Sequence, residues 1–360
     1  DKQTTDYGAI KQSMGLVSLA KPLTDDLSKK IASLFTDEEI GKFRRLMVTG
    51  CGDSYIAGVA TKKAFDELLK LDSLVEAVTT PELTYHVNPK KFKYGSVLMV
   101  GVSISGKARG TFDAVNACKE KGAFTVGITE DLNSPLGKAA DRVIKHDSTE
   151  TELAPGTKTY FTSVLTLLLL AVRMGESKGR YSAAQAEEYR KAIVDYVEAF
   201  GPKLEEINDQ VKGLVDKYSK CTHFDCAGSD TDYASAWFAR AKVYEATGIV
   251  TAVENTEDWC HVDYYARNPQ DIGTIVFLNS ENTGKSRMME AIRTMANIKR
   301  PTLVVTDLPK SEFPDGVDVI VIPKAKYDWM APLMQFMPIT LLCGYLQLAL
   351  GEKPLRGLEG

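Results

Sequence analysis

Short apolar runs alternate with amphipathic stretches along most of the chain. In the first half, the apolar runs predict strands, and the stretches between them repeat their apolar positions with the period of a helix. The predicted strands are 46–49, 74–78, 97–102 and 123–128, and the predicted helices are 54–69 and 108–121. Continuous apolar strands separated by helices indicate a parallel sheet covered on both faces, which is an α/β fold.

The same succession of elements returns roughly 175 residues later. The run Leu46–Ser54 has its counterpart in His223–Asp230, and the run Val97–Gly106 has its counterpart in Ile275–Gly284. The second copy predicts helices at 231–247 and 286–298, and strands at 249–253, 273–278, 302–305 and 318–322. We therefore expect two tandem doubly wound parallel-sheet domains.

The segments outside the two copies are mainly helical in pattern. The stretch 181–218 is polar and helix-periodic, and the apolar stretches 164–172 and 333–350 fall short of an uninterrupted membrane span of about 20 residues. We interpret both apolar stretches as buried helices and expect no membrane partner. The predicted organisation is an N-terminal helical segment 1–36, a first domain 37–180, a helical connector 181–218, a second domain 219–330, and a C-terminal helix and tail 331–360.

Composition and charge narrow the class of protein. The 44 Lys and Arg against 48 Asp and Glu leave a net charge of -4, which does not favour a nucleic-acid partner. The 6 cysteines form no CxxC pair and no dense framework, which favours a reducing, cytoplasmic setting. Neither a P-loop nor a metal-ligand spacing occurs in the sequence, so we expect no cofactor and no metal.

Two loops of the first copy are placed where open parallel sheets bind ligands, at the carboxyl ends of strands. One is Gly50–Ser54. The other is Ser103–Thr111, in which Ser103, Ser105, Gly106 and Thr111 precede or open a predicted helix. Small residues and hydroxyls at a helix N-terminus suit a phosphate group. The alternative is an ordinary strand-to-helix turn capped by serine.

The second copy offers candidate acid–base groups. Lys242 and Glu245 are three residues apart on the predicted helix 231–247 and so share a face. The alternative interpretation is a solvated surface salt bridge. His261 follows Glu257-Asp-Trp-Cys and, like the other three histidines, is a candidate for proton transfer near neutral pH.

Taken together, these motifs resemble the sugar isomerase (SIS) domain family. The resemblance rests on Gly50-Cys-Gly-Asp-Ser54 followed by Ser103-Ile-Ser-Gly106, and it extends over nearly the whole chain. It includes Gly156–Tyr160, Arg240–Glu245 and the stretch from Met330 to Leu358. Two tandem copies resemble the isomerase half of glucosamine-6-phosphate synthase and the fructosamine-6-phosphate deglycases.

The resemblance implies flavodoxin-like domains, a phosphosugar ligand and a role for each matched residue. It assigns phosphate contacts to Ser54, Ser103 and Ser105. It places Glu245 as the group that moves a proton between C1 and C2, with Lys242 beside it and His261 in ring opening. It also implies a homodimer with a composite active site, with helix 333–350 near the interface. We assign the lining of the sugar site to Cys51, Gly52, Asp53 and Ala154.

Three departures from the family pattern shape the expected activity. Ala108 stands where a phosphate-binding threonine is usual, and the tail 355–360 has no lysine to form a Schiff base. No glutamine-hydrolysing domain precedes Asp1, so we do not expect glutamine-dependent synthesis. The favoured function is isomerase or deglycase chemistry on a 6-phosphorylated amino sugar or fructosamine. The alternatives are a plain aldose–ketose sugar-phosphate isomerase and a non-catalytic phosphosugar sensor.

Overall fold

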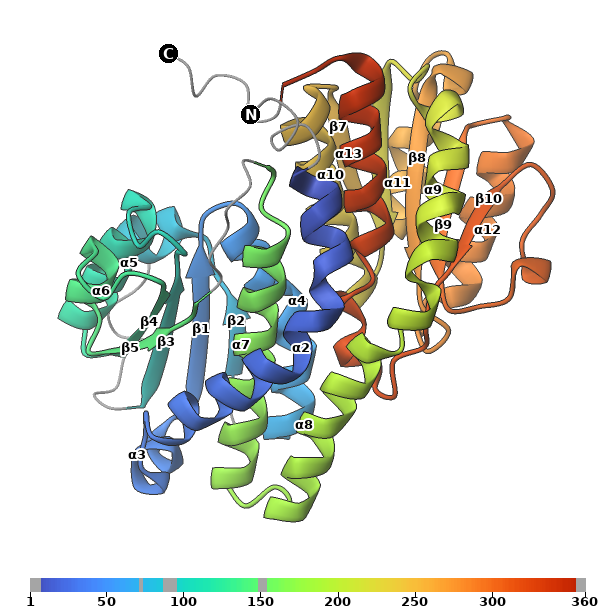
Figure 1. Ribbon diagram of the computed structural model, residues 1–360. Coiled ribbons are helices and arrows are strands. Elements are labelled where there is room, and N and C mark those ends of the chain that lie inside the picture. The colour runs from blue at the N-terminus through green and yellow to red at the C-terminus, as the bar shows by residue number, and fades with distance from the viewer. Residues whose placement is uncertain (1–7, 71–73, 87–95, 148–153, 354–360) are drawn as a thin grey trace. The chain divides into compact units, whose positions relative to one another are not determined.

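The computed structural model describes residues 8–70, 74–86, 96–147 and 154–353 (Figure 1). The chain forms two compact units, each built around one sheet. The N-terminal sheet unit contains residues 19–147 and 159–194 of the described chain, and the C-terminal sheet unit contains 8–18, 154–158 and 195–353. The predicted tail residues 355–360 lie outside the described residues.

The N-terminal sheet unit has a five-stranded parallel sheet in the order β2-β1-β3-β4-β5. Its strands are β1 (Arg45–Gly50), β2 (Leu74–Ala77), β3 (Val97–Val102), β4 (Phe124–Thr129) and β5 (Arg142–Lys145). Its helices are α3 (Asp37–Lys42), α4 (Asp53–Leu69), α5 (Arg109–Glu120), α6 (Pro135–Ala139) and α7 (Lys158–Ser177), with most of α2 (Gly8–Ala32) and α8 (Ala183–Glu198).

Side chains that alternate along the strands fill both faces of this sheet. Met47 and Met99 join the apolar cluster formed with Ala114 and Val115 of α5 and Leu136 of α6. The next residue of β1, Val48, packs against Gly58 of α4. A Cβ at Gly58 would lie only 3.0 Å from Val48 Cγ1. The missing side chain at Gly58 thus lets α4 pack closely on the opposite face.

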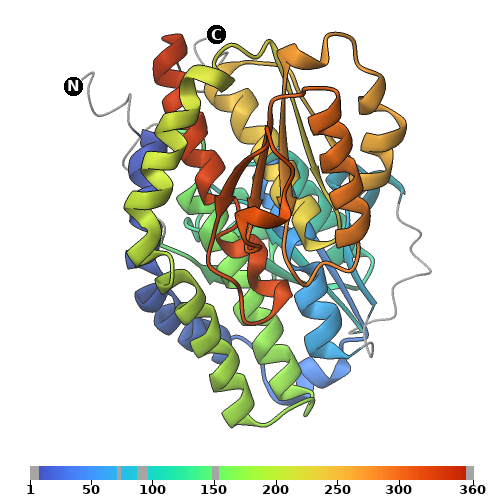
Figure 2. The ribbon, with the colours of Figure 1, turned by 90° about the vertical axis from the view of Figure 1, so that its right-hand side faces the viewer.

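The C-terminal sheet unit repeats this architecture, with all strands parallel in the order β10-β9-β8-β6-β7. Its strands are β6 (His223–Gly228), β7 (Thr251–Asn255), β8 (Ile272–Leu278), β9 (Thr302–Thr306) and β10 (Asp318–Val321). Its helices are α9 (Leu204–Tyr218), α10 (Thr231–Thr247), α11 (Thr256–His261), α12 (Lys285–Asn297) and α13 (Met337–Leu350). Helices α9 and α13 run side by side, and α13 also packs on α10 (Figure 2).

The predicted α/β class with two doubly wound parallel sheets is confirmed. Three details of the sequence prediction were wrong. Strand β5 was missed because it is short and flanked by charge. Strand β7 begins at Thr251 rather than 249, since Gly248 ends α10 in a left-handed conformation and the chain needs two residues to reach the sheet.

The third correction concerns the C-terminal apolar stretch. A 3-10 turn, Asp328–Leu333, precedes α13, which begins at Met337 instead of 333. The segment Asp328–Leu350 is apolar and long enough to cross a membrane, but 78% of its most apolar stretch is buried. Leu341, Leu342 and Leu346 are fully covered within the single chain, so the burial of α13 does not require a second copy.

Candidate functional site

The first loop of the site forms where β1 passes directly into α4. At Gly50, a Cβ would lie 2.5 Å from the Cβ of Ser54 and 2.9 Å from the carbonyl oxygen of Val102, so only glycine allows this approach. Gly52 adopts φ 56°, in the left-handed region, and is the N-cap of α4 without a side-chain cap. The backbone N–H groups that open α4 therefore lack a side-chain acceptor, which suits an anion.

The serine turn, residues 103–106, forms the second loop. The backbone N–H of Ser103 donates to Ile128 O at 3.0 Å, which ties the end of β3 to β4. Ser105 is exposed, and its Oγ accepts a hydrogen bond from the Lys107 N–H at 3.3 Å. Gly106 has φ 65°, and Ala108, the N-cap of α5, provides no side-chain cap. The start of α5 is thus a second uncapped helix N-terminus, beside the exposed Ser105 hydroxyl, whereas the Ser103 side chain is buried.

Thr111 lies beside Cys51, a residue that is itself exposed. Thr111 is buried in the first turn of α5, and its Oγ1 lies 3.6 Å from the Cys51 Sγ. The same sulfur lies 3.9 Å from Thr80 Oγ1. Because its hydroxyl is covered, Thr111 has the geometry of a support for the loop. Ala154 is also buried, and Asp53 is in the first turn of α4.

The Lys242–Glu245 pair lies on α10 of the C-terminal sheet unit. The Lys242 Nζ is 2.6 Å from Glu245 Oε2, and the two side chains are 1% and 32% exposed. The ammonium also lies 4.8 Å from the centre of the Phe238 ring. A buried ammonium needs a partner to offset its lost hydration, and the carboxylate and the ring supply it. The pair is therefore not the solvated surface bridge that the sequence left open.

His261 is the last residue of α11, and its side chain is 72% exposed. Its Nε2 lies 3.6 Å from Glu257 Oε2. The Arg287 guanidinium donates two hydrogen bonds to Glu257 and lowers the pKa of that carboxyl. The structure thus places His261 at the surface of its unit, with a carboxylate that can hold its ring.

A buried cluster fixes the helix that carries His261. Trp259 of α11 is buried, and its Nε1 donates to Asp225 Oδ2 at 3.1 Å. Arg300 pairs with the same carboxylate at 2.9 Å and lies 5.2 Å from the centre of the Trp259 ring. Sequence reasoning missed this cluster because Asp225 and Arg300 are far apart in the chain and neither belongs to a motif.

The described part of the chain brings no three His, Cys, Asp or Glu side chains into a group that could hold a metal. The two loops belong to the N-terminal sheet unit, while Lys242, Glu245 and His261 belong to the other unit.

Comparison with protein families and curated proteins gives consistent matches. The SIS domain matches residues 39–173. Glutamine–fructose-6-phosphate aminotransferase [isomerizing] of Clostridium tetani is 24% identical over 330 residues, covering 88% of this chain and 51% of the relative. The enzyme of the same name from Thermotoga maritima is 27% identical over 346 residues, covering 93% and 53%. The chain thus spans about half the length of the curated relatives it matches.

Solved structures share the architecture over almost the whole chain. The C-terminal domain of glucosamine-fructose-6-phosphate aminotransferase from Francisella tularensis matches with a TM-score of 0.82 at 18% identity, covering 98% of this chain and 99% of that one. Tagatose-6-phosphate ketose/aldose isomerase from Escherichia coli matches with a TM-score of 0.71 at 14% identity, covering 98% and 94%. At these identities the likeness shows the fold.

Proposed function

We propose that the chain, whose residues 39–173 match the SIS domain, is a phosphosugar isomerase of that family. In the proposed reaction it binds a 6-phosphorylated sugar and moves a proton between C1 and C2. The names of its relatives, which include enzymes of fructose 6-phosphate and tagatose 6-phosphate, support a hexose phosphate as the substrate class.

The Lys242–Glu245 pair is the observation that carries this proposal. Glu245 is the proposed proton shuttle, because a partly buried carboxylate can remove a proton next to a carbonyl and return it to the neighbouring carbon. Lys242 keeps a positive charge beside that carboxylate, where negative charge would develop on the enediolate oxygen. A surface salt bridge would offer neither burial nor a fixed position.

The proposed phosphate site is formed by Ser54, Ser103 and Ser105 with the N-termini of α4 and α5. Both helices begin without a side-chain cap, so N–H groups at their starts could donate to phosphate oxygens, while those of Ser54 and Tyr55 already donate to the carbonyls of Cys51 and Gly52. The proposed phosphate contacts are at C6 of the sugar, remote from the reacting carbons C1 and C2. Their binding energy would hold C1 and C2 against the acid–base groups.

His261 is the proposed group for ring opening. Its exposed imidazole suits a residue that acts at the surface of a second copy, which agrees with the expected homodimer and composite site. The negative charge of Glu257, 3.6 Å from Nε2, would help to orient the ring.

Within this chemistry we favour a 6-phosphofructosamine or a 6-phosphorylated amino sugar as substrate. Glu245 would convert the ketoamine into a glycosylamine, and water would then cleave the C1–N bond to give a sugar phosphate and a free amine. This route needs no Schiff-base lysine. Glucosamine-6-phosphate deaminase from Thermotoga maritima, a structure with a TM-score of 0.66 and 17% identity, has a name consistent with it.

Solvent deuterium exchange tests the proposal. Deuterium should enter C1 or C2 of fructose 6-phosphate, glucosamine 6-phosphate or a 6-phosphofructosamine. Glu245→Gln should lower that rate at least about 100-fold, because it removes the base. The matched control is Glu206→Gln, since Lys203 and Glu206 form the same i,i+3 pair at 2.9 Å with side chains 51% and 55% exposed.

The products separate the candidate functions. Release of amine and sugar phosphate supports the deglycase, and exchange without release supports a plain aldose–ketose isomerase. Binding with no exchange, unaffected by Glu245→Gln, would show a sensor and contradict the proposal.

A further inference from the structure

We infer that the second copy carries its own anion, the Asp232 carboxylate, at the place where the first copy receives the phosphate, so that each chain binds a single phosphosugar. This inference rests on the proposed function. Beyond that function, the inference says that the loops of the first copy, and not the similar loops of the second, bind the ligand. It also sets the number of ligands at one per chain.

The two copies share the same unusual backbone conformation at the residue that precedes their first sheet helix. Gly52 has φ 56° and ψ −126°, and Asp230 has φ 55° and ψ −128°. Each is the N-cap of a 17-residue helix that follows the first strand of its unit, α4 after β1 in one copy and α10 after β6 in the other. Ser54 therefore corresponds to Asp232, each the second residue of its helix.

The loops that follow β3 and β8 each begin with a polar residue at the carboxyl end of the strand. Ser103 is the first residue after β3, and Asn279 is the first residue after β8. The first copy thus has two uncharged hydroxyl side chains at these places, Ser54 and Ser103. The second copy has a carboxylate and an amide.

Side chains and backbone surround the Asp232 carboxylate as they would surround a bound anion. It is fully buried and accepts hydrogen bonds from Asn279 N at 3.0 Å and Asn279 Nδ2 at 2.9 Å. Asn282 Nδ2 and Gln335 Nε2 also donate to it, each at 2.7 Å. Ser235 fixes the amide of Gln335 by donating to its Oε1 at 2.7 Å. Because these four N–H groups already donate to the Asp232 carboxylate, they are not available as hydrogen-bond donors to a phosphate.

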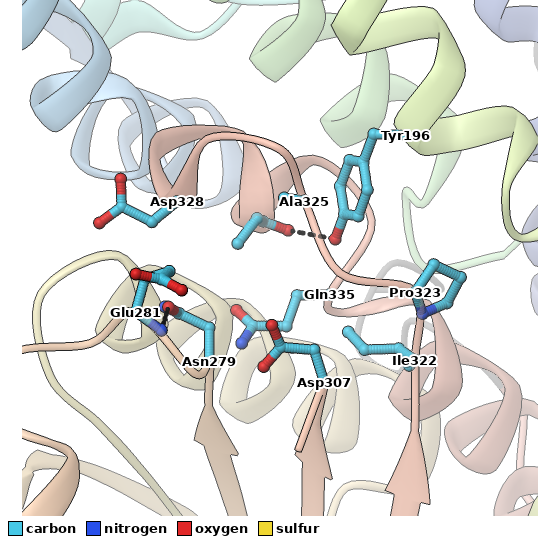
Figure 3. A pocket seen from close by; sticks show the side chains of 10 residues that line it. Tyr196, Asn279, Glu281, Asp307, Ile322, Pro323, Ala325, Asp328 and Gln335 are labelled. Carbon is cyan, nitrogen blue, oxygen red and sulfur yellow. Dashed lines mark hydrogen bonds between the residues drawn. The ribbon is translucent and has the colours of Figure 1, made fainter. Parts of the chain in front are cut away.

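A small, acidic space is lined by Asn279 and Gln335, two of the residues that donate hydrogen bonds to Asp232 (Figure 3). Asn279, Asp307 and Ile322 reach it from the ends of β8, β9 and β10, and Glu281 and Asp328 line it as well. Its volume is about 10 Å³, room for about one water molecule, whereas small-molecule sites take about 300–1,000 Å³. Lys324 forms an ion pair with Glu281, and the carboxylates of Asp307 and Asp328 would repel a phosphate.

Binding stoichiometry tests the inference directly. Titration calorimetry with fructose 6-phosphate should give one ligand per wild-type chain, and Ser103→Ala combined with Ser105→Ala should remove it. Two ligands per chain, or half of the capacity remaining in the double variant, would overturn the inference and leave the proposed function standing. No binding by the wild type would overturn the proposed function, and formate rescue would then decide the inference.

Formate rescue asks whether the carboxylate place is an anion site. Asp232→Ala should lower the melting temperature by several degrees, and millimolar formate should restore at least half of that loss. Sodium chloride at equal ionic strength, and formate added to the exposed-site variant Asp209→Ala, are the controls. Equal effects of formate and chloride on Asp232→Ala would overturn the inference. If Asp232→Ala does not fold, the stoichiometry decides.

Discussion

At the scale of single residues, buried charges decide where this chain is specialised. Lys242, Arg300 and Asp232 are almost completely buried, and each meets a partner of suitable chemistry. Removing the partner of a buried charge costs several kcal/mol, so such residues are tied to their surroundings. Asp232 meets only neutral donors; burial raises its pKa, and the hydrogen bonds from Gln335 and the two asparagines oppose that rise.

His146 gives a pH-dependent prediction at this scale. It is fully buried after β5, and burial lowers its pKa to about 4 from an ordinary 6.5. In the unfolded chain, His146 binds a proton below about pH 6.5, whereas in the folded chain it does so only near pH 4. The free energy of unfolding therefore falls as the pH drops from 6.5 to 4. The loss should approach about 3 kcal/mol.

His146→Gln should remove that part of the acid sensitivity. The measurement is the free energy of unfolding in urea from pH 7 to pH 4 for the wild type and the variant. The slope between pH 6.5 and 4 should be shallower in the variant, whatever its absolute stability. Parallel slopes would show that His146 is not the titrating group.

At the scale of elements, the local pattern predicted most helices and strands well. Helix 231–247 begins and ends as predicted, because Gly248 follows an uninterrupted helical stretch. Strand β5 was missed because a four-residue edge strand with charged ends has no distinct period. The start of α13 was misplaced because Pro332 closes a 3-10 turn that the apolar pattern alone does not separate from the helix.

Close packing of α2 on α13 gives a prediction at this scale. A Cβ at Gly344 would lie 2.8 Å from Ile10 Cγ1 and 3.4 Å from the Ala9 Cβ. Gly344→Val should therefore force these helices apart and lower the free energy of unfolding by about 1–3 kcal/mol.

The control is a glycine in open space. A Cβ at Gly213 of α9 would meet nothing within 4 Å among the described residues. Gly213→Ala should raise the free energy of unfolding by about 0.5–1 kcal/mol, because alanine favours the helix. Urea unfolding of both variants measures the contrast, and effects of the same sign would contradict the packing argument.

At the scale of the whole molecule, one architecture is used twice with different chemistry. The first copy offers hydroxyls and uncapped helix starts, and the second offers the buried pair and an internal carboxylate. Such a division fits the proposal that one copy holds the phosphate while residues of the other act on the sugar. The proposed second subunit would complete the site with His261.

Exposed aromatic residues beside His261 make the assembly testable. Val262 is exposed, and Tyr265, three residues further along the chain, is 74% exposed in the single chain. If this segment docks on a second copy, Tyr265→Ser should shift the chain from dimer to monomer in light scattering at micromolar concentration. Deuterium exchange should fall about tenfold with it.

Tyr85→Ser is the matched control, since Tyr85 is also 74% exposed and lies in the other unit. It should leave mass and exchange rate unchanged. A wild-type chain that is already monomeric, with full exchange activity, would contradict the proposed composite site.

The sequence by itself determined the strands, the helices, the repeat and the turn glycines, because period and backbone preference act over a few residues. Only the tertiary structure decided what the charged residues do. The same Lys-x-x-Glu pattern occurs at Lys203–Glu206 and at Lys242–Glu245, exposed in the first case and buried in the second. Likewise, Asp232 meets Gln335 across about 100 residues of chain. Burial and such distant contacts depend on which surfaces pack together, and no short stretch of sequence encodes that.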